Sequence, residues 1–113
     1  MKPADLVVVF IEFTDSSNGK VRPAIVIKKL DDTLVCFRVT SQFQNKSLLI
    51  KEHYYEIKDW KFAGLKKKSW IDIGSVAKII LADTSYKKIG TLSLSDIEGL
   101  KNFIENYYGY ILG

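Results

Sequence analysis

The sequence has a single cysteine, Cys36, and a single histidine, His53. One cysteine excludes an internal disulfide, and its place in the apolar stretch TLVCFRV predicts a small buried residue of an intracellular protein. His53 has no cysteine or second histidine near it, so we expect neither a catalytic triad nor a zinc site, but a surface or half-buried side chain. This scarcity of cysteine and histidine therefore indicates a protein without a metal or other cofactor.

Long apolar runs are also missing. No stretch approaches the roughly 20 apolar residues of a membrane-spanning helix, and LVVVF near the N-terminus lacks the build of a signal peptide. Neither a P-loop nor a G-x-G-x-x-G motif is present. Hydrophobic residues make up 47% of the 113 residues, which is enough for a core. We therefore expect one soluble, cytoplasmic domain over residues 1–113 that does not enter a membrane.

Arginine is scarce, because only Arg22 and Arg38 are arginines among 17 lysines and arginines. The net charge of +4 favours a polyanionic partner only weakly, since many lysine-rich domains are merely soluble. Arg22 follows a polar, glycine-containing loop and precedes Pro23 at the entry to the apolar stretch AIVI. A guanidinium group presents a planar fork of donors that suits phosphate, so this placement raises a functional question.

What the sequence does contain is a series of β-branched and aromatic runs of strand length. They predict strands at residues 6–13, 23–28, 33–40 and 53–60, around Trp70, and at residues 75–82. Turn formers at residues 14–20 predict a polar loop between the first two strands. The stretch DWKFAGL predicts one helical turn, with Asp59 as N-cap and Gly64 as terminator.

The C-terminal segment has the pattern of one amphipathic helix. Ser93 and Asp96 have the spacing of a capping box, and Leu92 and Ile97 occupy the positions of a hydrophobic staple. Apolar side chains then recur at helical spacing, at Ile97, Leu100, Phe103, Ile104, Tyr107, Tyr108 and Ile111. The sequence therefore predicts a mainly β fold, a small and strongly curved antiparallel β-barrel or sandwich, with this helix docked on the sheet.

Polar side chains near the early strands supply the remaining candidate chemistry. The hydroxyl and amide groups that can bind phosphate or base edges belong to Ser16, Ser17, Asn18, Thr40, Ser41, Gln42 and Asn45. Phe43 is either a stacking platform for a base or an aromatic tucked into the core. Taken singly, each of these residues has an ordinary explanation as a loop or surface group.

Three motifs in order resemble the MazF/PemK (Kid) family of toxin endoribonucleases. They are ADLVVVFIEFTDSSNGKVRPAIVIKK near the start, RVTSQFQNK at residues 38–46, and KKIGTLSLSDI at residues 87–97. The resemblance implies an SH3-like barrel and a homodimer that inhibits growth by metal-independent cleavage of single-stranded RNA. It also implies neutralisation by a small acidic antitoxin, with operator DNA bound only through the antitoxin complex.

The resemblance further implies that Arg22 and Thr40 are the catalytic pair. A preorganised arginine would stabilise the charge that gathers on the phosphoryl oxygens when a 2′-OH attacks the adjacent phosphate. Thr40 would bind a phosphoryl oxygen or position the attacking 2′-OH. The pKa of its own hydroxyl is far too high for it to act unaided as a general base. The residues expected to contact RNA are Ser17, Asn18, Lys20, Arg38, Ser41, Gln42, Asn45 and Lys46.

Two departures from the family pattern leave alternatives open. Some members have a histidine where this chain has Val21, and an acidic-Gln-hydrophobic-Arg stretch corresponds here to GSVAK, residues 74–78. The general base therefore has no assignment. The alternatives are a catalytically weakened barrel that binds RNA or a peptide, and a toxin of the gyrase-directed branch.

Overall fold

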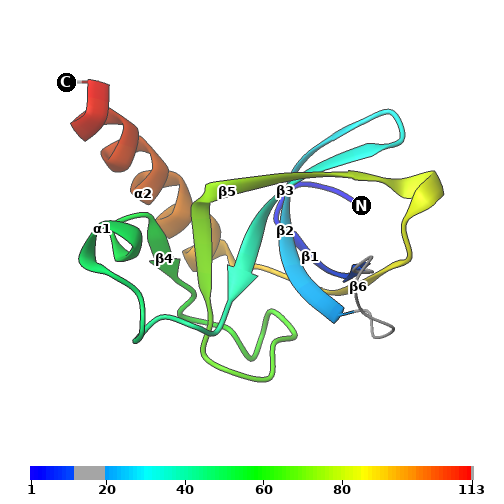
Figure 1. Ribbon diagram of the computed structural model, residues 1–113, viewed down its shortest axis with the longest axis horizontal. Helices are drawn as coiled ribbons and strands as arrows, with labels where there is room; N and C mark the ends of the chain where they lie inside the picture. The colour runs from blue at the N-terminus through cyan, green and yellow to red at the C-terminus, as the bar shows by residue number, and fades with distance from the viewer. Residues whose placement is uncertain (12–19, 113) are drawn as a thin grey trace.

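The computed structural model describes residues 1–11 and 20–112, with side chains described for residues 1–9 and 22–109 (Figure 1). The predicted loop at residues 14–19 and the end of the first predicted strand lie outside this part of the chain. The elements are β1 (Asp5–Ile11), β2 (Lys20–Leu30), β3 (Thr33–Thr40), α1 (Leu48–Lys51), β4 (Tyr54–Glu56), β5 (Trp70–Ile80), the 3-10 turn η1 (Leu81–Asp83), β6 (Tyr86–Thr91) and α2 (Leu94–Leu112). No helix in the described ranges is long and apolar enough to cross a membrane.

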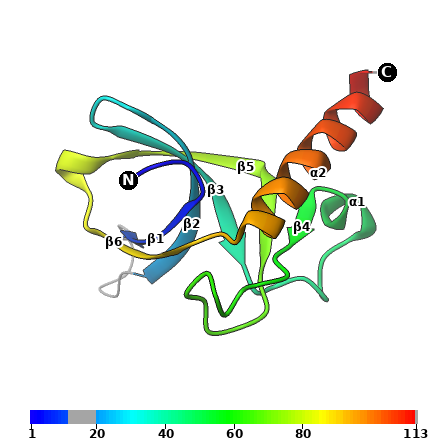
Figure 2. The ribbon, with the colours of Figure 1, turned by 180° about the vertical axis from the view of Figure 1, so that it is seen from behind.

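The strands form one six-stranded sheet in the order β4-β5-β3-β2-β1-β6. Every pair of neighbours is antiparallel. The sheet curves strongly, and α2 lies across the face near β4 and β5 (Figures 1 and 2). The prediction of a mainly β, strongly curved antiparallel fold with a C-terminal helix is confirmed. Between the described strands the pairing ends at β4 and β6, so the sheet is not closed into a barrel.

Alternating side chains give the sheet a core on each face. Leu6, Ile25 and Ile71 belong to the core that α2 covers, whereas Val7 and Cys36 belong to a second core on the opposite face. The prediction of a buried Cys36 is confirmed. Burial raises the pKa of its thiol to about 11, which leaves it protonated and unreactive at neutral pH.

The start of α2 is held by its predicted cap. The Ser93 hydroxyl accepts a hydrogen bond from the Asp96 amide at 3.1 Å. The buried Asp96 carboxylate also reaches β4 and the loop after it, where it accepts the Tyr55 hydroxyl at 2.7 Å and the Lys58 and Asp59 backbone amides at 2.9 and 2.8 Å. Burial and this hydrogen bond raise the pKa of Tyr55, so its hydroxyl remains a donor. The cap therefore also ties α2 to the sheet.

The predicted helical turn at residues 59–65 is a single turn and not a helix. The Ala63 amide donates to the Asp59 carbonyl, and the chain leaves the turn at Gly64, whose φ is +92°. A Cβ on Gly64 would lie 2.2 Å from the Ile89 carbonyl oxygen, so glycine permits the turn to pack against β6.

Two predicted strands around Trp70 and residues 75–82 are in fact one long strand, β5. Arg38 of β3 pairs with Asp72, but the preceding residue, Phe37, pairs with Val76. Residues 73–75 therefore form a bulge inside β5, where the two predicted strands meet. The sequence patterns also missed α1 and the edge strand β6.

Candidate functional site

Arg22 and Thr40, the pair that the family resemblance implies, line the same hollow. Its volume is about 320 Å³, and its wall consists of Arg22, Pro23, Arg38, Val39, Thr40, Ser41, Gln42, Leu65, Lys66, Lys67 and Ser69. Two guanidinium groups, two ammonium groups and several hydroxyl and amide groups therefore meet in one small space. Such a wall suits a polyanion better than an apolar ligand.

Strand register explains why these residues meet. Ala24 lies opposite Arg38 on β3, so the same register continued toward the end of β3 brings Arg22 opposite Thr40. Pairing of β2 with β3 is described only from Ala24 onward, whereas β1 pairs with β2 over residues 20–25. Pro23 therefore lies inside β2 and not at its entry, at a point where one neighbouring strand has separated and a missing N–H is tolerated.

A second hollow of about 550 Å³ adjoins the first. It shares Arg22, Pro23 and Arg38 with the first hollow and is otherwise lined by Val9, Ala24, Ser75, Val76, Ala77, Lys78, Ile79 and Thr84. The two arginines therefore stand where a polar hollow meets a more apolar one. Together the hollows offer an extended surface with cationic groups at its middle.

Asp72 organises the side chains beside these hollows. Its carboxylate is 3% exposed and accepts His53 Nδ1 and the Gly74 amide, each at 2.9 Å, on Oδ1. Its Oδ2 accepts the Ser75 hydroxyl at 2.8 Å and Arg38 Nη2 at 3.1 Å. Burial acts to raise the pKa of Asp72, but these hydrogen bonds outweigh it and hold the pKa below its usual value. Asp72 is therefore ionised at neutral pH, and it closes the β5 bulge.

Arg38 is held in place more firmly than exposure alone suggests. Its side chain is 46% exposed, yet one nitrogen, Nη2, binds both Asp72 at 3.1 Å and the Tyr54 hydroxyl at 3.0 Å. Tyr54 and Arg38 both pair with Asp72 across the sheet, so all three belong to one cross-strand row. Arg38 also lines both hollows.

His53 is half-buried, as the sequence predicts, but its pairing with Asp72 is new. The imidazole is also in edge contact with the rings of Tyr54 and Tyr107. Sequence patterns did not identify Asp72 as a site residue, because two of its partners lie far away in sequence, on β3 and in the loop before β4. The stretch DIGS did carry a local signal, since an aspartate commonly accepts hydrogen bonds from the residues two and three positions later.

The other predicted RNA contacts divide into three groups. Ser41 and Gln42 line the smaller hollow, and the backbone N–H of Gln42 donates to the Thr40 hydroxyl at 3.0 Å. The hydroxyl proton of Thr40 can therefore donate elsewhere. Asn45 and Lys46 line neither hollow. Lys20 begins β2, whereas the predicted contacts Ser17 and Asn18 lie outside the described residues, as does Ser16.

Phe43 packs against the body of the protein. Its ring stacks on Trp70 with a centroid distance of 4.5 Å and an interplanar angle of 7°. The Lys51 ammonium lies 4.8 Å from the Phe43 centroid. Phe43 is half-buried and belongs to neither of the two cores, so its ring packs on Trp70 at the surface and not in the core.

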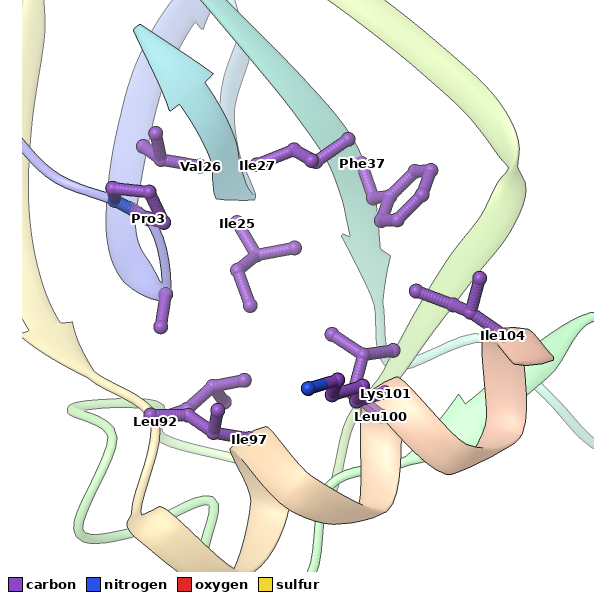
Figure 3. Close-up of a pocket in the computed structure, with 11 residues that line it drawn as sticks. Pro3, Ile25, Val26, Ile27, Phe37, Leu92, Ile97, Leu100, Lys101 and Ile104 are labelled. Atoms are coloured by element: carbon purple, nitrogen blue, oxygen red, sulfur yellow. The ribbon is translucent and has the colours of Figure 1, made fainter.

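A further hollow lies between β2 and α2 and is almost entirely apolar (Figure 3). Its volume is about 350 Å³, and Lys101 is the only charged residue among those that line it. Ile25, Phe37 and Ile104 are among its apolar walls. This hollow lacks convergent polar groups, so it is a weaker candidate for a catalytic site than the arginine-lined surface.

Comparison with known proteins gives structural matches only. No protein-family model and no curated protein sequence matches the chain. Among solved structures, the Mycobacterium tuberculosis toxin MazF-mt6 is similar with a TM-score of 0.61 and 17% identity, over 90% of this chain and 96% of that one. The MazE–MazF structure (Form-II) from Deinococcus radiodurans is similar with a TM-score of 0.70 and 11% identity, over 96% of each chain. MazF (Form-I) from the same organism has a TM-score of 0.62 and 12% identity, again over 96% of each chain.

These matches agree with the resemblance found in the sequence motifs. Structural neighbours over nearly the full length of the chain are MazF toxins. Since identities of 11–17% establish fold alone, activity has to be argued from the site.

Proposed function

We propose that this chain, which has the fold of the MazF toxins, is the toxin of a type II toxin–antitoxin pair and cleaves single-stranded RNA without a metal ion. The observation that supports this proposal is the meeting of Arg22, Arg38 and Thr40 in one hollow beside Lys66 and Lys67. Phosphoryl transfer within RNA needs little more than positioning and stabilisation of charge, which these groups are suited to supply.

The reaction begins when an RNA 2′-OH attacks the adjacent phosphate. As negative charge gathers on the phosphoryl oxygens, the Arg22 guanidinium stabilises it through charge-assisted hydrogen bonds. Thr40 donates its hydroxyl proton to a phosphoryl oxygen. The backbone N–H of Gln42 already donates to the Thr40 oxygen, so the hydroxyl proton is directed elsewhere. The products are a 2′,3′-cyclic phosphate and a free 5′-OH.

The adjoining hollows fit an extended single strand. Lys66 and Lys67 at one end and Lys78 at the other extend the positive charge beyond the two arginines. Backbone phosphates would follow these cations, and the strength of binding would fall as salt is added. The apolar wall of the larger hollow, including Val9 and Val76, would receive the faces of unstacked bases.

A small acidic antitoxin and a second copy of the chain are the partners we propose. In Deinococcus radiodurans, MazF is found in a structure together with MazE. An acidic, largely disordered segment would complement the same cationic hollows and exclude RNA from them. Growth would then stop when the antitoxin is lost, and operator DNA would be bound only through the toxin–antitoxin complex.

RNA cleavage with end mapping tests the proposal. The wild-type protein should cleave single-stranded RNA in EDTA, and Arg22→Ala should lower the rate on the order of 100-fold or more. Lys29→Ala is a matched control, because Lys29 is exposed on the same strand and lines neither hollow. Full activity in Arg22→Ala, or equal loss in both variants, would contradict the site assignment.

A second candidate is a non-catalytic module with the same fold. The apolar part of the larger hollow, at Ala24, Val76 and Ile79, favours it because a peptide side chain would fit there as well as a base. Salt-dependent binding of RNA that stays intact would support an RNA-binding module. Inhibition of gyrase without RNA cleavage would support a toxin that acts on a protein.

A further inference from the structure

The only histidine of the sequence has a specific place that the reaction described above does not use. His53 Nδ1 lies 2.9 Å from Asp72 Oδ1, and the imidazole is 21% exposed. Because the carboxylate is ionised and can only accept, the hydrogen on this contact belongs to Nδ1. In the neutral ring the other nitrogen, Nε2, therefore carries the lone pair. A carboxylate that fixes one nitrogen and leaves the other as a base is the arrangement that proton-transfer histidines use.

The same carboxylate also holds the second arginine. Asp72 binds His53 through Oδ1 and Arg38 through Oδ2, at 2.9 and 3.1 Å. The imidazole and a guanidinium that borders both hollows are thus fixed by one buried group. The relative placement of the two groups does not depend on flexible surface side chains, because Asp72 is itself tied to the β5 bulge by Gly74 and Ser75.

Gly74 leaves space for the imidazole. A Cβ on this residue would lie 2.9 Å from His53 Nδ1 and 3.3 Å from Asp72 Oδ1, closer than ordinary contacts. The departure at residue 74, where the family pattern has an acidic side chain, is therefore matched by a histidine that occupies the space beside it.

We propose that His53 is the proton-transfer residue of RNA cleavage and that Arg38 binds the phosphate beside it. This inference rests on the proposed endoribonuclease function. His53 Nε2 takes the proton of the 2′-OH while the 2′-oxygen forms a bond to phosphorus and the bond between phosphorus and the 5′-oxygen breaks. The departing 5′-oxygen takes a proton from water, and the imidazolium returns its proton to solvent. No oxidant, reductant or other reactant is needed.

Side chains from four elements surround His53. Asp72 from β5 is the charged group in direct contact, Arg38 from β3 lies on the same carboxylate, and the rings of Tyr54 from β4 and Tyr107 from α2 border the imidazole. Only the neutral imidazole can accept the proton, so cleavage should slow in acid, where an imidazole is protonated. The wild-type profile of kcat/KM should therefore show an acid limb.

The test is the pH–rate profile of RNA cleavage by wild type, His53→Gln and His53→Ala. We expect each variant to lose roughly 100-fold to 10,000-fold in rate, the range typical of a proton-transfer residue. The acid limb should vanish in both variants, and added imidazole should restore part of the rate to His53→Ala. Tyr107→Phe is the matched control, since it keeps the ring against His53 and should retain both the rate and the acid limb.

The outcomes separate this inference from the proposed function. If His53→Gln keeps the wild-type rate and acid limb while Arg22→Ala is inactive, the protein is a nuclease and the role of His53 is wrong. If the rate falls but the acid limb remains and imidazole does not rescue, His53 acts only in packing and the inference also fails. If folded wild type cleaves no RNA, the proposed function itself fails, and the inference fails with it.

Discussion

The two arginines of this protein belong to differently built regions. Arg22 is exposed on a part of β2 that pairs with β1 but not with β3. Its position is set by the strand and by the following Pro23. Arg38 belongs to a row of hydrogen-bonded side chains around the buried Asp72. We infer that the charge of Arg22 can be removed with little effect on folding. Changes around Asp72 should instead lower both the stability of the fold and the rate of cleavage.

The largest effect on stability should come from Asp72→Ala. This change removes the acceptor for four donors and leaves Arg38 and the β5 bulge without their common partner. The free energy of unfolding should fall by roughly 3 kcal/mol, at the lower end for a broken buried pair because Arg38 is half exposed. Denaturant unfolding would measure it, with Asp83→Ala, an exposed aspartate, as the control.

Arg22→Ala should leave the denaturation midpoint within experimental error of wild type while cleavage is lost. A destabilisation by Arg22→Ala as large as that caused by Asp72→Ala would remove the distinction between the two regions.

A smaller effect is expected at the cap of α2, far from either arginine. Ser93→Ala removes the acceptor of the Asp96 amide and the donor to the Asp59 carboxylate. The free energy of unfolding should fall by about 1 kcal/mol, the usual cost of losing an N-cap. Ser95→Ala, in the first turn of α2 but exposed, should change it little. RNA cleavage should be unaffected, and a loss of cleavage would mean that α2 contributes to the site.

The smallest effect concerns acid stability. The pKa of Asp72 is below its usual value of 3.8 in the folded protein, so its contribution to stability is present above that value. It should be lost as the pH falls through the lowered pKa, because the unfolded chain then binds the proton more readily. Below pH 4, the slope of unfolding free energy against pH should therefore be shallower in Asp72→Asn than in wild type. An unchanged slope would mean that other carboxylates account for acid unfolding.

Local pattern was sufficient for much of the fold. The strand at residues 33–40 and the helix with its Ser93–Asp96 cap were predicted with nearly their observed bounds. These elements have strong periodicity or a defined cap, so their identity depends on neighbours in sequence. The edge strand β6 was missed because YKKIGT is short and half polar, and pairing with β1 makes it a strand.

The same division holds for the candidate site. Arg22, Arg38 and Thr40 were identifiable because arginine is rare and because the motifs place them at the ends of strands. Their meeting in one hollow follows from the register of β2 and β3, which shifts between Val26 and Lys28.

Asp72 and His53 could not be joined from sequence. They are 19 residues apart and meet at the three-residue bulge in β5, where the Asp72 carboxylate binds Arg38 on β3 and His53 in the loop before β4. Residue types and spacing thus determined the strands, the capped helix and the arginines available for phosphate. Long-range pairing decided which histidine nitrogen is held and which arginine stands beside it, because a buried charge takes its properties from whatever the folded chain brings into contact with it.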